Sequence, residues 1–347
     1  MNCVATVIGL DISKNVFVAV GRDDQGREAF RKKFSRHQVL AFFAKAAPAK
    51  VGIEACASAH HWARALAGQG HEVRLIAGQH VKAYLTGNKN DANDAAAIAE
   101  ARSRAMTKYV PVNTEAQQDL QMMHRVRQSL IERRTGVINQ ARGLLGEYGV
   151  VIATGARTLR RELVAILTSD ARGLSATALD TFRDLSQQLD DLEARITRYD
   201  ERILQAARAD ERAQRLMEVP GVGVLTATAL LASLNDASHF GNGRHFAANL
   251  GLVPHEHSTG GRQRLFGISK RGDRYLRMLL IHGARSALQW AHKRTDNILR
   301  WAADLQQRKG TNVAAVALAN KLARIVWALL AHGRRYEPMH ITSTLVH

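Results

Sequence analysis

The sequence predicts an α/β section at the N-terminus, a helical middle section and a mostly helical C-terminal section. Three observations predict this organisation. Short apolar runs, several of them β-branched, recur before residue 111. After residue 112, apolar residues recur at helical spacing instead. A turn-forming stretch, Val219-Pro-Gly-Val-Gly223, follows near residue 216. The expected sections are therefore residues 1–111, 112–215 and 216–340.

Five strands are expected in the first section, over residues 4–11, 16–20, 28–34, 50–54 and 71–77. Polar residues 22–27 have the chemistry of a hairpin turn between the second and third strands. Residues 59–70 are typical of a helix closed by glycine. Three hairpin-linked strands, then strand, helix and strand, is the order of the ribonuclease-H-like fold. We expect that fold here.

A heptad seam marks the middle section. Its members, spaced alternately three and four residues apart, are Phe182, Leu185, Leu189, Leu192, Ile196, Tyr199 and Ile203. This spacing predicts a coiled coil or a long helical hairpin, and it fits an intramolecular hairpin and a dimer contact equally well. An earlier helix over residues 115–148 carries Arg125, Arg127, Arg133, Arg134 and Arg142. Those arginines form either a solvated face or a contact with phosphate.

The charge balance points to a polyanionic partner. The chain holds 49 Lys and Arg against 31 Asp and Glu, a formal net charge of +18, which favours nucleic acid. No run of about 18 apolar residues is expected to cross a membrane. Asp11 and Lys14 interrupt the N-terminal apolar stretch, so no secretory signal is expected. Cys3 and Cys56 suggest two core thiols in a reducing cytosol, with neither a disulfide framework nor a zinc module.

Four carboxylates form the first candidate site. Asp11 and Glu54 each end an expected strand, where an ionised carboxylate is costly unless it is paired or bound to a cation. Asp91 and Asp94 open an expected helix, and their spacing puts both on one face. Oxygen ligands suit a hard cation such as magnesium, and two such ions can promote phosphodiester chemistry. Alternatively, Asp91 caps its helix and Asp11 ends a strand in a turn.

The C-terminal section holds two further candidates. Residues 217–229 look like a helix-hairpin-helix element, in which Gly221 and Gly223 bring backbone N–H groups to a phosphate; a plain turn between helices is the alternative. Ser258 lies in a glycine-flanked loop, where it is either a turn hydroxyl or a nucleophile. His255 and His257 are general bases or exposed loop histidines. The neighbouring cations, which suit phosphate binding, are Arg262, Arg264, Lys270, Arg271, Arg274 and Arg277.

Together these motifs resemble the insertion-sequence transposases of the IS-one-ten family, and more closely its one-one-one-one subgroup. They occur in family order between about residues 5 and 335: Gly9-Leu-Asp-Ile-Ser-Lys14, Gly52-Ile-Glu-Ala55, Lys89-Asn-Asp-Ala-Asn-Asp-Ala95, Val219-Pro-Gly-Val-Gly223, Gly251-Leu-Val-Pro-His-Glu-His-Ser-Thr-Gly-Gly261 and Gly267-Ile-Ser-Lys-Arg-Gly-Asp-Arg274. Some members carry several serines in the loop of the nucleophile. Here Thr259 is the nearby competitor of Ser258.

The resemblance implies a RuvC-like first domain whose Asp-Glu-Asp-Asp metal set falls on Asp11, Glu54, Asp91 and Asp94. It also implies a C-terminal transposase domain with its serine nucleophile at Ser258. The implied enzyme is a DNA recombinase of a bacterial or archaeal cytoplasm, guided by a structured non-coding bridge RNA. Its loops pair with donor and target DNA. A dimer, or a dimer of dimers, joins the acids of one subunit to the serine of another. The implied chemistry passes through a phosphoserine link to DNA, with Mg²⁺ or Mn²⁺ at the acids.

Three rival functions stay open at this level. A metal-dependent nuclease or junction resolvase would use the same acids with water as the nucleophile. A non-catalytic nucleic-acid-binding relic gains nothing from four carboxylates that face a polyanion. A sugar-kinase-like ATPase also opens with residues such as Ile8-Gly-Leu-Asp11, but it needs further glycine-rich phosphate loops, which residues 112–215 do not offer.

Overall fold

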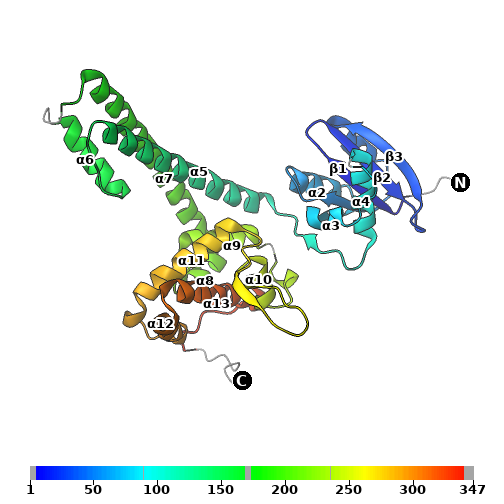
Figure 1. Cartoon of the computed structure of the whole chain (residues 1–347). Helices are drawn as coiled ribbons and strands as arrows, with labels where there is room; N and C mark the ends of the chain where they lie inside the picture. The colour runs from blue at the N-terminus through cyan, green and yellow to red at the C-terminus, as the bar shows by residue number, and fades with distance from the viewer. Residues whose placement is uncertain (1–4, 89, 169–172, 235, 340–347) are drawn as a thin grey trace. The chain divides into compact units, whose positions relative to one another are not determined.

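Two compact units make up the chain, and they meet between Thr114 and Glu115 (Figure 1). The computed structural model describes residues 5–88, 90–168, 173–234 and 236–339, so Cys3 and Lys89 lie outside the described residues. The division lies three residues from the boundary expected at 111. The boundary expected at 215 falls inside the second unit, and a division into three domains stays a prediction.

The first unit is built on a six-stranded mixed sheet. In spatial order its strands are β3 (Glu28–Ser35), β2 (Val16–Arg22), β1 (Val7–Ile12), β4 (Lys50–Glu54), β5 (Glu72–Ile76) and β6 (Tyr109–Val110). The first three strands are antiparallel to one another, and β4 and β5 run parallel to β1. The five expected strands are confirmed, and the order agrees with a ribonuclease-H-like sheet. The two-residue β6, antiparallel to β5, was not predicted because it is too short to carry a pattern.

Helices cover both faces of this sheet. One face packs on α1 (Val39–Phe43) and α2 (Ala59–Ala67) through a core that includes Leu10, Phe17 and Trp62. The other face packs on α4 (Asp91–Ser103), which contacts β1, β2 and β4. Successive side chains of a strand point to opposite faces. Since Leu10 faces α2, the neighbouring Gly9 faces α4.

Glycines seat α4 directly on the sheet. Gly9 and Gly52 are register partners on β1 and β4. A Cβ atom on Gly9 would lie 2.1 Å from the carbonyl oxygen of Ala95 and 2.4 Å from the backbone nitrogen of Ala99. A Cβ on Gly52 would lie 3.0 Å from Cβ of Arg102. The backbone of α4 therefore approaches β1 at a distance that only glycine permits.

Replacing Gly9 is expected to destabilise the first unit. In Gly9→Ala the new methyl group overlaps backbone atoms that cannot rotate away, so we expect a loss of about 1–3 kcal/mol of unfolding free energy. Gly68→Ala is the matched control in the same unit, because its Cβ would make ordinary contacts of 3.4 and 3.5 Å. Urea unfolding followed by circular dichroism measures both. Equal stability of the two variants would contradict the close approach of α4.

The second unit begins with a long helical hairpin. Helix α5 (Glu115–Glu147) packs on α7 (Ala176–Ala209), and α6 (Ala156–Thr168) packs on both (Figure 1). From Phe182 to Ile196 the heptad seam of α7 is buried in a core with Leu130, Leu145 and Leu163. Tyr199 is half-buried against the same core, and Ile203 is also buried. The hairpin alternative is thus confirmed, since the seam packs inside its own chain. A supercoiled coiled coil and a dimer contact through this region stay predictions.

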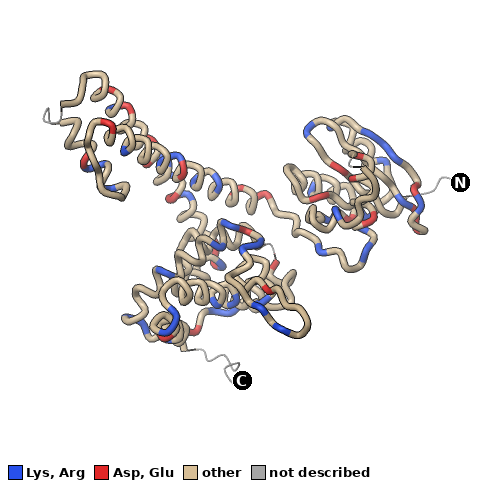
Figure 2. The backbone as a smooth tube through the Cα atoms, in the orientation of Figure 1, with Lys and Arg blue, Asp and Glu red and all other residues tan. Residues whose placement is uncertain are grey.

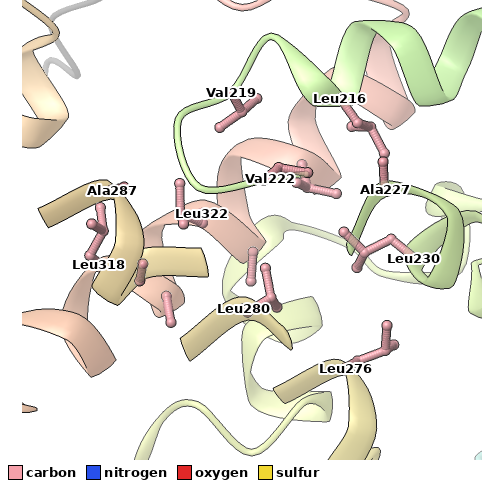
Figure 3. Close-up of a cluster of buried hydrophobic side chains, with 14 of the residues drawn as sticks. Leu216, Val219, Val222, Ala227, Leu230, Leu276, Leu280, Ala287, Leu318 and Leu322 are labelled. Carbon is pink, nitrogen blue, oxygen red and sulfur yellow. The ribbon is translucent and has the colours of Figure 1, made fainter. Parts of the chain in front are cut away.

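The rest of the second unit is a helical cluster with one small hairpin. Its elements are α8 (Glu211–Met217), α9 (Val224–Ser233), α10 (Gly243–Asn249), β7 (Pro254–Glu256), β8 (Leu265–Ile268), α11 (Arg274–Gln289), α12 (Asn297–Lys309) and α13 (Thr311–His332). Figure 3 shows the core, where Leu230, Leu280 and Leu322 of three different helices meet. The mostly helical character expected of the C-terminal section is confirmed. The hairpin of β7 and β8 was not predicted.

Helix α13 is long and apolar enough to cross a membrane by length and composition. This corrects the expectation that the chain holds no such run. Its buried residues, among them Leu318, Leu322 and Val326, belong to the core of the second unit. The apolar composition is therefore accounted for by packing against α10, α11 and α12.

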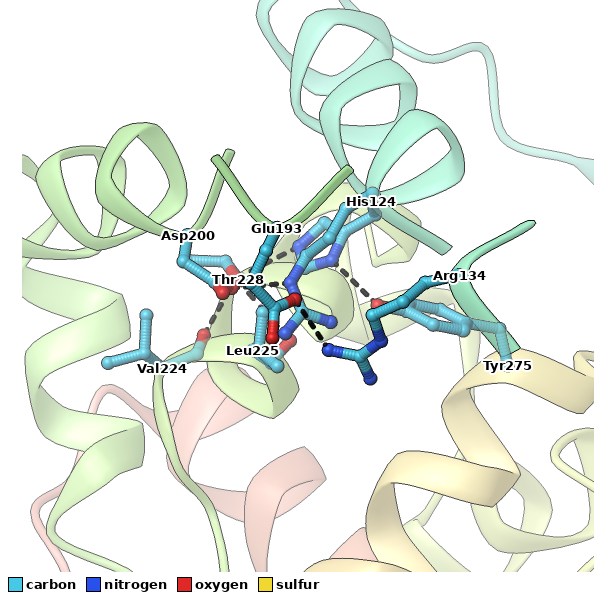
Figure 4. Close-up of polar contacts among 9 residues, drawn as sticks. His124, Arg134, Glu193, Asp200, Val224, Leu225, Thr228 and Tyr275 are labelled. Carbon is cyan, nitrogen blue, oxygen red and sulfur yellow. Dashed lines mark hydrogen bonds and ion pairs between the residues drawn. The ribbon is translucent and has the colours of Figure 1, made fainter. Parts of the chain in front are cut away.

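A polar network joins α5, α9 and α11 where the hairpin meets the helical cluster (Figure 4). The buried ring of His124 lies 3.0 Å from the hydroxyl groups of both Tyr275 and Thr228. The Thr228 hydroxyl donates to the Val224 carbonyl at 2.7 Å, so it accepts from Nε2–H of His124. The neutral imidazole then accepts from Tyr275 through Nδ1. Burial, followed by the charge of Arg127, lowers the pKa of His124 to about 4.

This histidine predicts a loss of stability in mild acid. Because its pKa is lower in the folded chain than the usual 6.5, the unfolded chain gains the proton first as the pH falls. The stability is complete above about pH 6.5 and is lost progressively toward pH 4, by about 3 kcal/mol. His124→Gln should start less stable at pH 7 and lose less between pH 7 and 5, whereas the exposed His292→Gln should follow the natural protein. Urea unfolding followed by tryptophan fluorescence measures the change; an identical loss in all three proteins would contradict it.

Candidate metal centre and serine hairpin

Asp11 and Glu54 lie on neighbouring strands and on the same face of the sheet. Strands β1 and β4 are parallel, with Leu10 opposite Ile53, one residue before each carboxylate. Asp11 follows Gly9 by two residues and Glu54 follows Gly52 by two. The two-residue period of a strand therefore turns both carboxylates toward the face on which α4 packs. Both side chains are half-buried.

Asp91 and Asp94 reach the same region from the first turn of α4. Asn90 caps this helix, because its side chain accepts from the backbone N–H of Asn93 at 2.8 Å. The alternative in which Asp91 serves as the cap is therefore wrong, and neither carboxylate is used in capping. The close packing of α4 on Gly9 and Gly52 fixes how near the first turn of α4 lies to β1, and therefore how near its carboxylates lie to Asp11.

The electrostatics of Asp11 show that the four carboxylates interact. Burial, then the charges of Asp94, Asp91 and Glu54 in that order, raises the pKa of Asp11 to about 6. The exposed Cys56, two residues beyond Glu54, has its pKa raised by burial and by the charges of Glu54 and Asp11. Cys56 is thus not the core thiol that we expected, because the chain leaves β4 at this point and turns outward.

The oxygen donors of this group fit a hard divalent cation, although they do not form a closed cage. Within the described ranges, no three His, Cys, Asp or Glu side chains converge tightly enough to hold a metal ion by themselves. Like charges repel unless a cation lies between them. Burial is the largest cause of the raised pKa of Asp11, and repulsion by the other three carboxylates adds to it. A divalent cation would relieve that repulsion and satisfy the preference of such ions for carboxylate oxygens.

Gly78 is a residue of this site that the sequence analysis missed. A Cβ atom on this first residue of α3 (Gly78–Lys82) would lie 2.4 Å from Oε1 of Glu54. The carboxylate of Glu54 therefore rests against a bare backbone position, and a side chain at residue 78 would displace it. A Gly two residues after β5 was the available signal, but its partner Glu54 lies 24 residues earlier in the chain.

The serine lies beside the tip of the hairpin formed by β7 and β8. Thr259 and Arg262 pair across the tip, and Gly260 and Gly261 between them both adopt positive φ angles, 57° and 75°. Two successive residues of this kind form the tight hairpin turn that favours glycine. Ser258 is therefore held at the end of a short ladder rather than in an irregular loop. The paired glycines were the available signal for this hairpin.

Ser258 contacts a carboxylate directly. Its hydroxyl donates to Oε1 of Glu256 at 2.6 Å and accepts from the backbone N–H of Arg264 at 3.3 Å. Glu256 was not singled out in the sequence analysis, although it lies two residues before the serine, on the same strand face. His255 packs near Phe266 across the hairpin, with ring centroids 6.1 Å apart. No hydrogen bond joins the His257 side chain to Ser258 among the described side chains, and Glu256 is the carboxylate that the hydroxyl contacts.

Most of the cations predicted around the serine are exposed. Those that form no salt bridge within the described part of the chain are Arg262, Arg264, Lys270, Arg271 and Arg274. Figure 2 marks the Lys and Arg positions along the chain in blue. Arg277 is an exception and corrects the prediction. It is buried, and its Nη1 donates to the carbonyls of Leu250 and Arg271 at 3.0 and 2.9 Å. Arg277 therefore fixes the base of the hairpin and is not available to a phosphate.

The comparison with known proteins decides the family. Residues 213–299 match the model of the transposase IS116/IS110/IS902 family, and residues 8–150 match the model of a DEDD transposase domain of IS110 elements. A probable family 20 transposase of Pseudomonas aeruginosa is 49% identical over 95% of this chain and 98% of its own length. The chain belongs to the IS110 family of transposases. The transposase of insertion sequence element IS1111A from Coxiella burnetii is 43% identical over 95% of this chain and 91% of its own.

The turn between α8 and α9 of this transposase has a packing role. Gly221 has a φ of +85°, and its Cβ would lie 2.7 Å from the carbonyl oxygen of Gly283 on α11. The exposed Gly223 is the N-cap residue of α9. Gly221 is thus required for close helix packing, while Gly223 leaves the start of α9 open. Contact of either glycine with nucleic acid stays a prediction.

The arginines of α5 divide into two groups in the transposase. Arg127 pairs with Asp200, and Arg134 pairs with Glu193 at 2.8 Å, both across the helical hairpin. Arg142 donates to the carbonyls of Ala153 and Gly155. These three therefore stabilise the hairpin. Arg125 and Arg133 are exposed, with no ion pair in the described part of the chain, and they stay candidates for phosphate contact.

Proposed function

We propose that this transposase cuts and rejoins DNA through a covalent link between Ser258 and a DNA phosphate. The observation that carries the proposal is the hydrogen bond of the Ser258 hydroxyl to Glu256, beside exposed cations that form no salt bridge with the described residues. A serine becomes a nucleophile when a neighbouring base takes its proton. Here the carboxylate of Glu256 is within that reach, at 2.6 Å.

The proposed cleavage step uses Ser258 as the nucleophile and Glu256 as the base. Ser258 Oγ forms a bond to the phosphorus of a DNA phosphodiester, its proton passes to Glu256, and the bond from phosphorus to the leaving sugar oxygen breaks. The leaving oxygen takes up a proton and becomes a free hydroxyl. In the second step, the hydroxyl of the new partner strand attacks the phosphoserine, and Ser258 leaves as the alcohol. The phosphate contacts that orient the strand are assigned to Arg262, Arg264, Lys270, Arg271 and Arg274.

Asp11, Glu54, Asp91 and Asp94 are the residues that hold the divalent cation in this proposal, Mg²⁺ or Mn²⁺. When bound, such a cation stabilises negative charge on the phosphodiester oxygens. The four carboxylates belong to the first unit and Ser258 to the second. We propose, as the family resemblance implies, that the acids of one subunit serve the serine of another in a dimer or a dimer of dimers.

Sequence choice is assigned to a structured guide RNA encoded beside the gene, whose loops pair with donor and target DNA. Base pairing then selects the site while the protein binds shape and backbone. The exposed arginines and lysine on and beside the hairpin of β7 and β8 suit a protein that binds the DNA backbone, since contacts of arginine and lysine with phosphate carry no sequence information.

The guide assignment predicts that the target can be reprogrammed. Purified transposase is incubated with Mg²⁺, donor DNA and RNA from the flanking non-coding segment, and junctions are sequenced. Changing the target-pairing loop should move insertion to the matching new site. At the old site, each mismatched base pair should cost about 1–3 kcal/mol of binding free energy. A control RNA with the loop scrambled should give no insertion. Insertion at the old site with every RNA, or with none, would contradict the guide.

A further inference from the structure

The second unit holds a basic, aromatic-lined pocket whose lining includes neither the four carboxylates nor Ser258. Its volume is about 800 Å³, within the roughly 300–1,000 Å³ range of small-molecule sites. The walls come from α10, α12, α13 and the segment after α13. We name it the α13 pocket.

Cations dominate the charged groups of the α13 pocket. Its lining includes Arg244, Lys321, Arg324, Arg334 and Arg335, against one carboxylate, Glu337. Arg335 reaches Glu218 at 3.9 Å, outside the pocket. Lys321, Arg324 and Arg244 form no ion pair among the described residues. Burial, followed by the charge of Arg324, lowers the pKa of Lys321. The pocket therefore carries positive charge that an anion would compensate.

Aromatic rings stand beside these cations, and their polar ends are already satisfied. Nε1 of Trp327 donates to the Ala237 carbonyl at 2.9 Å, and the Tyr336 hydroxyl donates to Asp296 at 3.0 Å. The ammonium of Lys321 lies 3.6 Å from the ring centroid of Trp301. Both rings line the pocket and also pack against the core of the second unit, and the ring of His332 lies 5.5 Å from that of Trp327. Because their polar ends are satisfied inside the protein, Trp327 and Tyr336 offer a ligand apolar ring surface rather than hydrogen-bonding groups.

The pocket is held open by backbone contacts. Asn297 N–H donates to the Pro338 carbonyl at 3.0 Å, and Arg215 donates to the Gly333 carbonyl at 2.8 Å. Gly243 on the opposite wall packs against Arg324, where a Cβ would lie 3.0 Å from the Arg324 Cα. Binding here therefore requires little ordering of the chain, which lowers its entropic cost.

We propose that the α13 pocket binds one or two unpaired nucleotides of a nucleic acid. Each base stacks on the aromatic wall of Trp327 and Tyr336, and its phosphate meets Lys321, Arg324 and Arg244. Single-strand sites combine these two features, a cationic surface for the backbone and aromatic faces for the bases. An acidic peptide would match the cations, but it offers nothing to the aromatic faces. The proposal needs no particular catalytic mechanism, since it concerns binding alone.

The test measures binding of labelled single-stranded DNA to the full chain by fluorescence anisotropy, with EDTA present so that no strand is cleaved. One ligand is a short oligothymidylate, and the other is an abasic strand of equal length and charge. The natural protein should bind the oligothymidylate about tenfold more tightly. Tyr336→Leu should lose this preference, whereas Tyr336→Phe should keep it because the ring remains.

The cationic half of the pocket is tested with a matched pair of lysines. Lys321 lies over Trp301 inside the pocket, and Lys293 lies over Trp290 outside it, 4.6 Å from the ring centroid. Lys321→Gln should weaken binding severalfold and lower the salt dependence by about one unit of log–log slope. Lys321→Arg should restore both, and Lys293→Gln should change neither.

Three results would overturn the proposal. Equal binding of the abasic strand by the natural protein would leave only a charged surface. An equal effect of Lys321→Gln and Lys293→Gln would show that general charge, not the pocket, attracts the strand. Displacement of the oligothymidylate by an oligoglutamate peptide at equal charge concentration would show a site for acidic peptides. Because no cleavage is measured, none of these results depends on the roles of Ser258 or the four carboxylates.

Discussion

Asp11→Asn is expected to lower magnesium-dependent DNA cleavage by about a thousandfold, equivalent to about 4 kcal/mol of activation free energy. Asp11 interacts electrostatically with the other three acids of the group, so the variant removes the proposed metal ligand that is coupled to all three. Asparagine keeps the shape and the polarity but not the charge. The assay measures the rate of strand cleavage on supercoiled donor DNA with saturating Mg²⁺. Asp24→Asn, an exposed acid of the same unit, should leave the rate unchanged.

The same variant has a readout that does not need activity. In the metal-free protein, the raised pKa of about 6 means that ionised Asp11 destabilises the fold above that pH. Asp11→Asn should therefore melt at a higher temperature than the natural protein at pH 7.5. This advantage should shrink as the pH falls below about 6 and vanish below the usual pKa of 3.8, where Asp11 is protonated in the folded and the unfolded chain. Added Mg²⁺ should raise the melting temperature of the natural protein more than that of the variant. Cleavage by Asp11→Asn at the natural rate would contradict the proposed metal site at Asp11.

Ser258→Ala is expected to abolish strand joining, with a loss of at least about 10⁴-fold, because removing a nucleophile leaves only binding and electrostatic effects. DNA binding should persist, since the hairpin turn depends on Gly260 and Gly261 rather than on the hydroxyl. Glu256→Gln should slow joining by about 10²-fold, the usual contribution of a general base. The measurements are joined product by sequencing and DNA affinity by anisotropy.

Thr259→Ala is the matched control, because Thr259 is the neighbouring hydroxyl and pairs with Arg262 through its backbone. It should join DNA at the natural rate. If instead Ser258→Ala cleaves normally and Asp11→Asn does not, water is the nucleophile, and the chain acts as a metal-dependent nuclease.

The placement of the four acids was predictable because the pattern around each of them is local. Asp11 and Glu54 follow apolar strands, and two-residue alternation turns them to one face of the sheet. Asp91 and Asp94 follow Asn90, whose capping signal is also local. The close approach of Gly9 to α4 was not predictable, because its partner backbone at Ala95 lies 86 residues away. Nor was the seat of Glu54 on Gly78, for the same reason.

The serine site was predictable only in part. Composition identified the cationic stretch around Ser258, but it could not separate exposed arginines from the buried Arg277, whose partner Leu250 lies 27 residues earlier. The same limit applies to the arginines of α5. Arg127 and Arg134 look like Arg125 in sequence, but they pair with acids on α7. Which cations remain available to phosphate depends on tertiary contacts, and those are invisible to charge patterns.

Identification of the DNA-linked peptide tests the central claim most directly. The natural protein is incubated with guide RNA, Mg²⁺ and a DNA substrate whose leaving strand is lost on cleavage. The trapped adduct is then digested and sequenced by mass spectrometry. We expect a phosphodiester from DNA to Ser258 in the natural protein and no adduct in Ser258→Ala or Asp11→Asn. Cleaved DNA with no protein attached, or an adduct on another residue that persists in Ser258→Ala, would contradict the account.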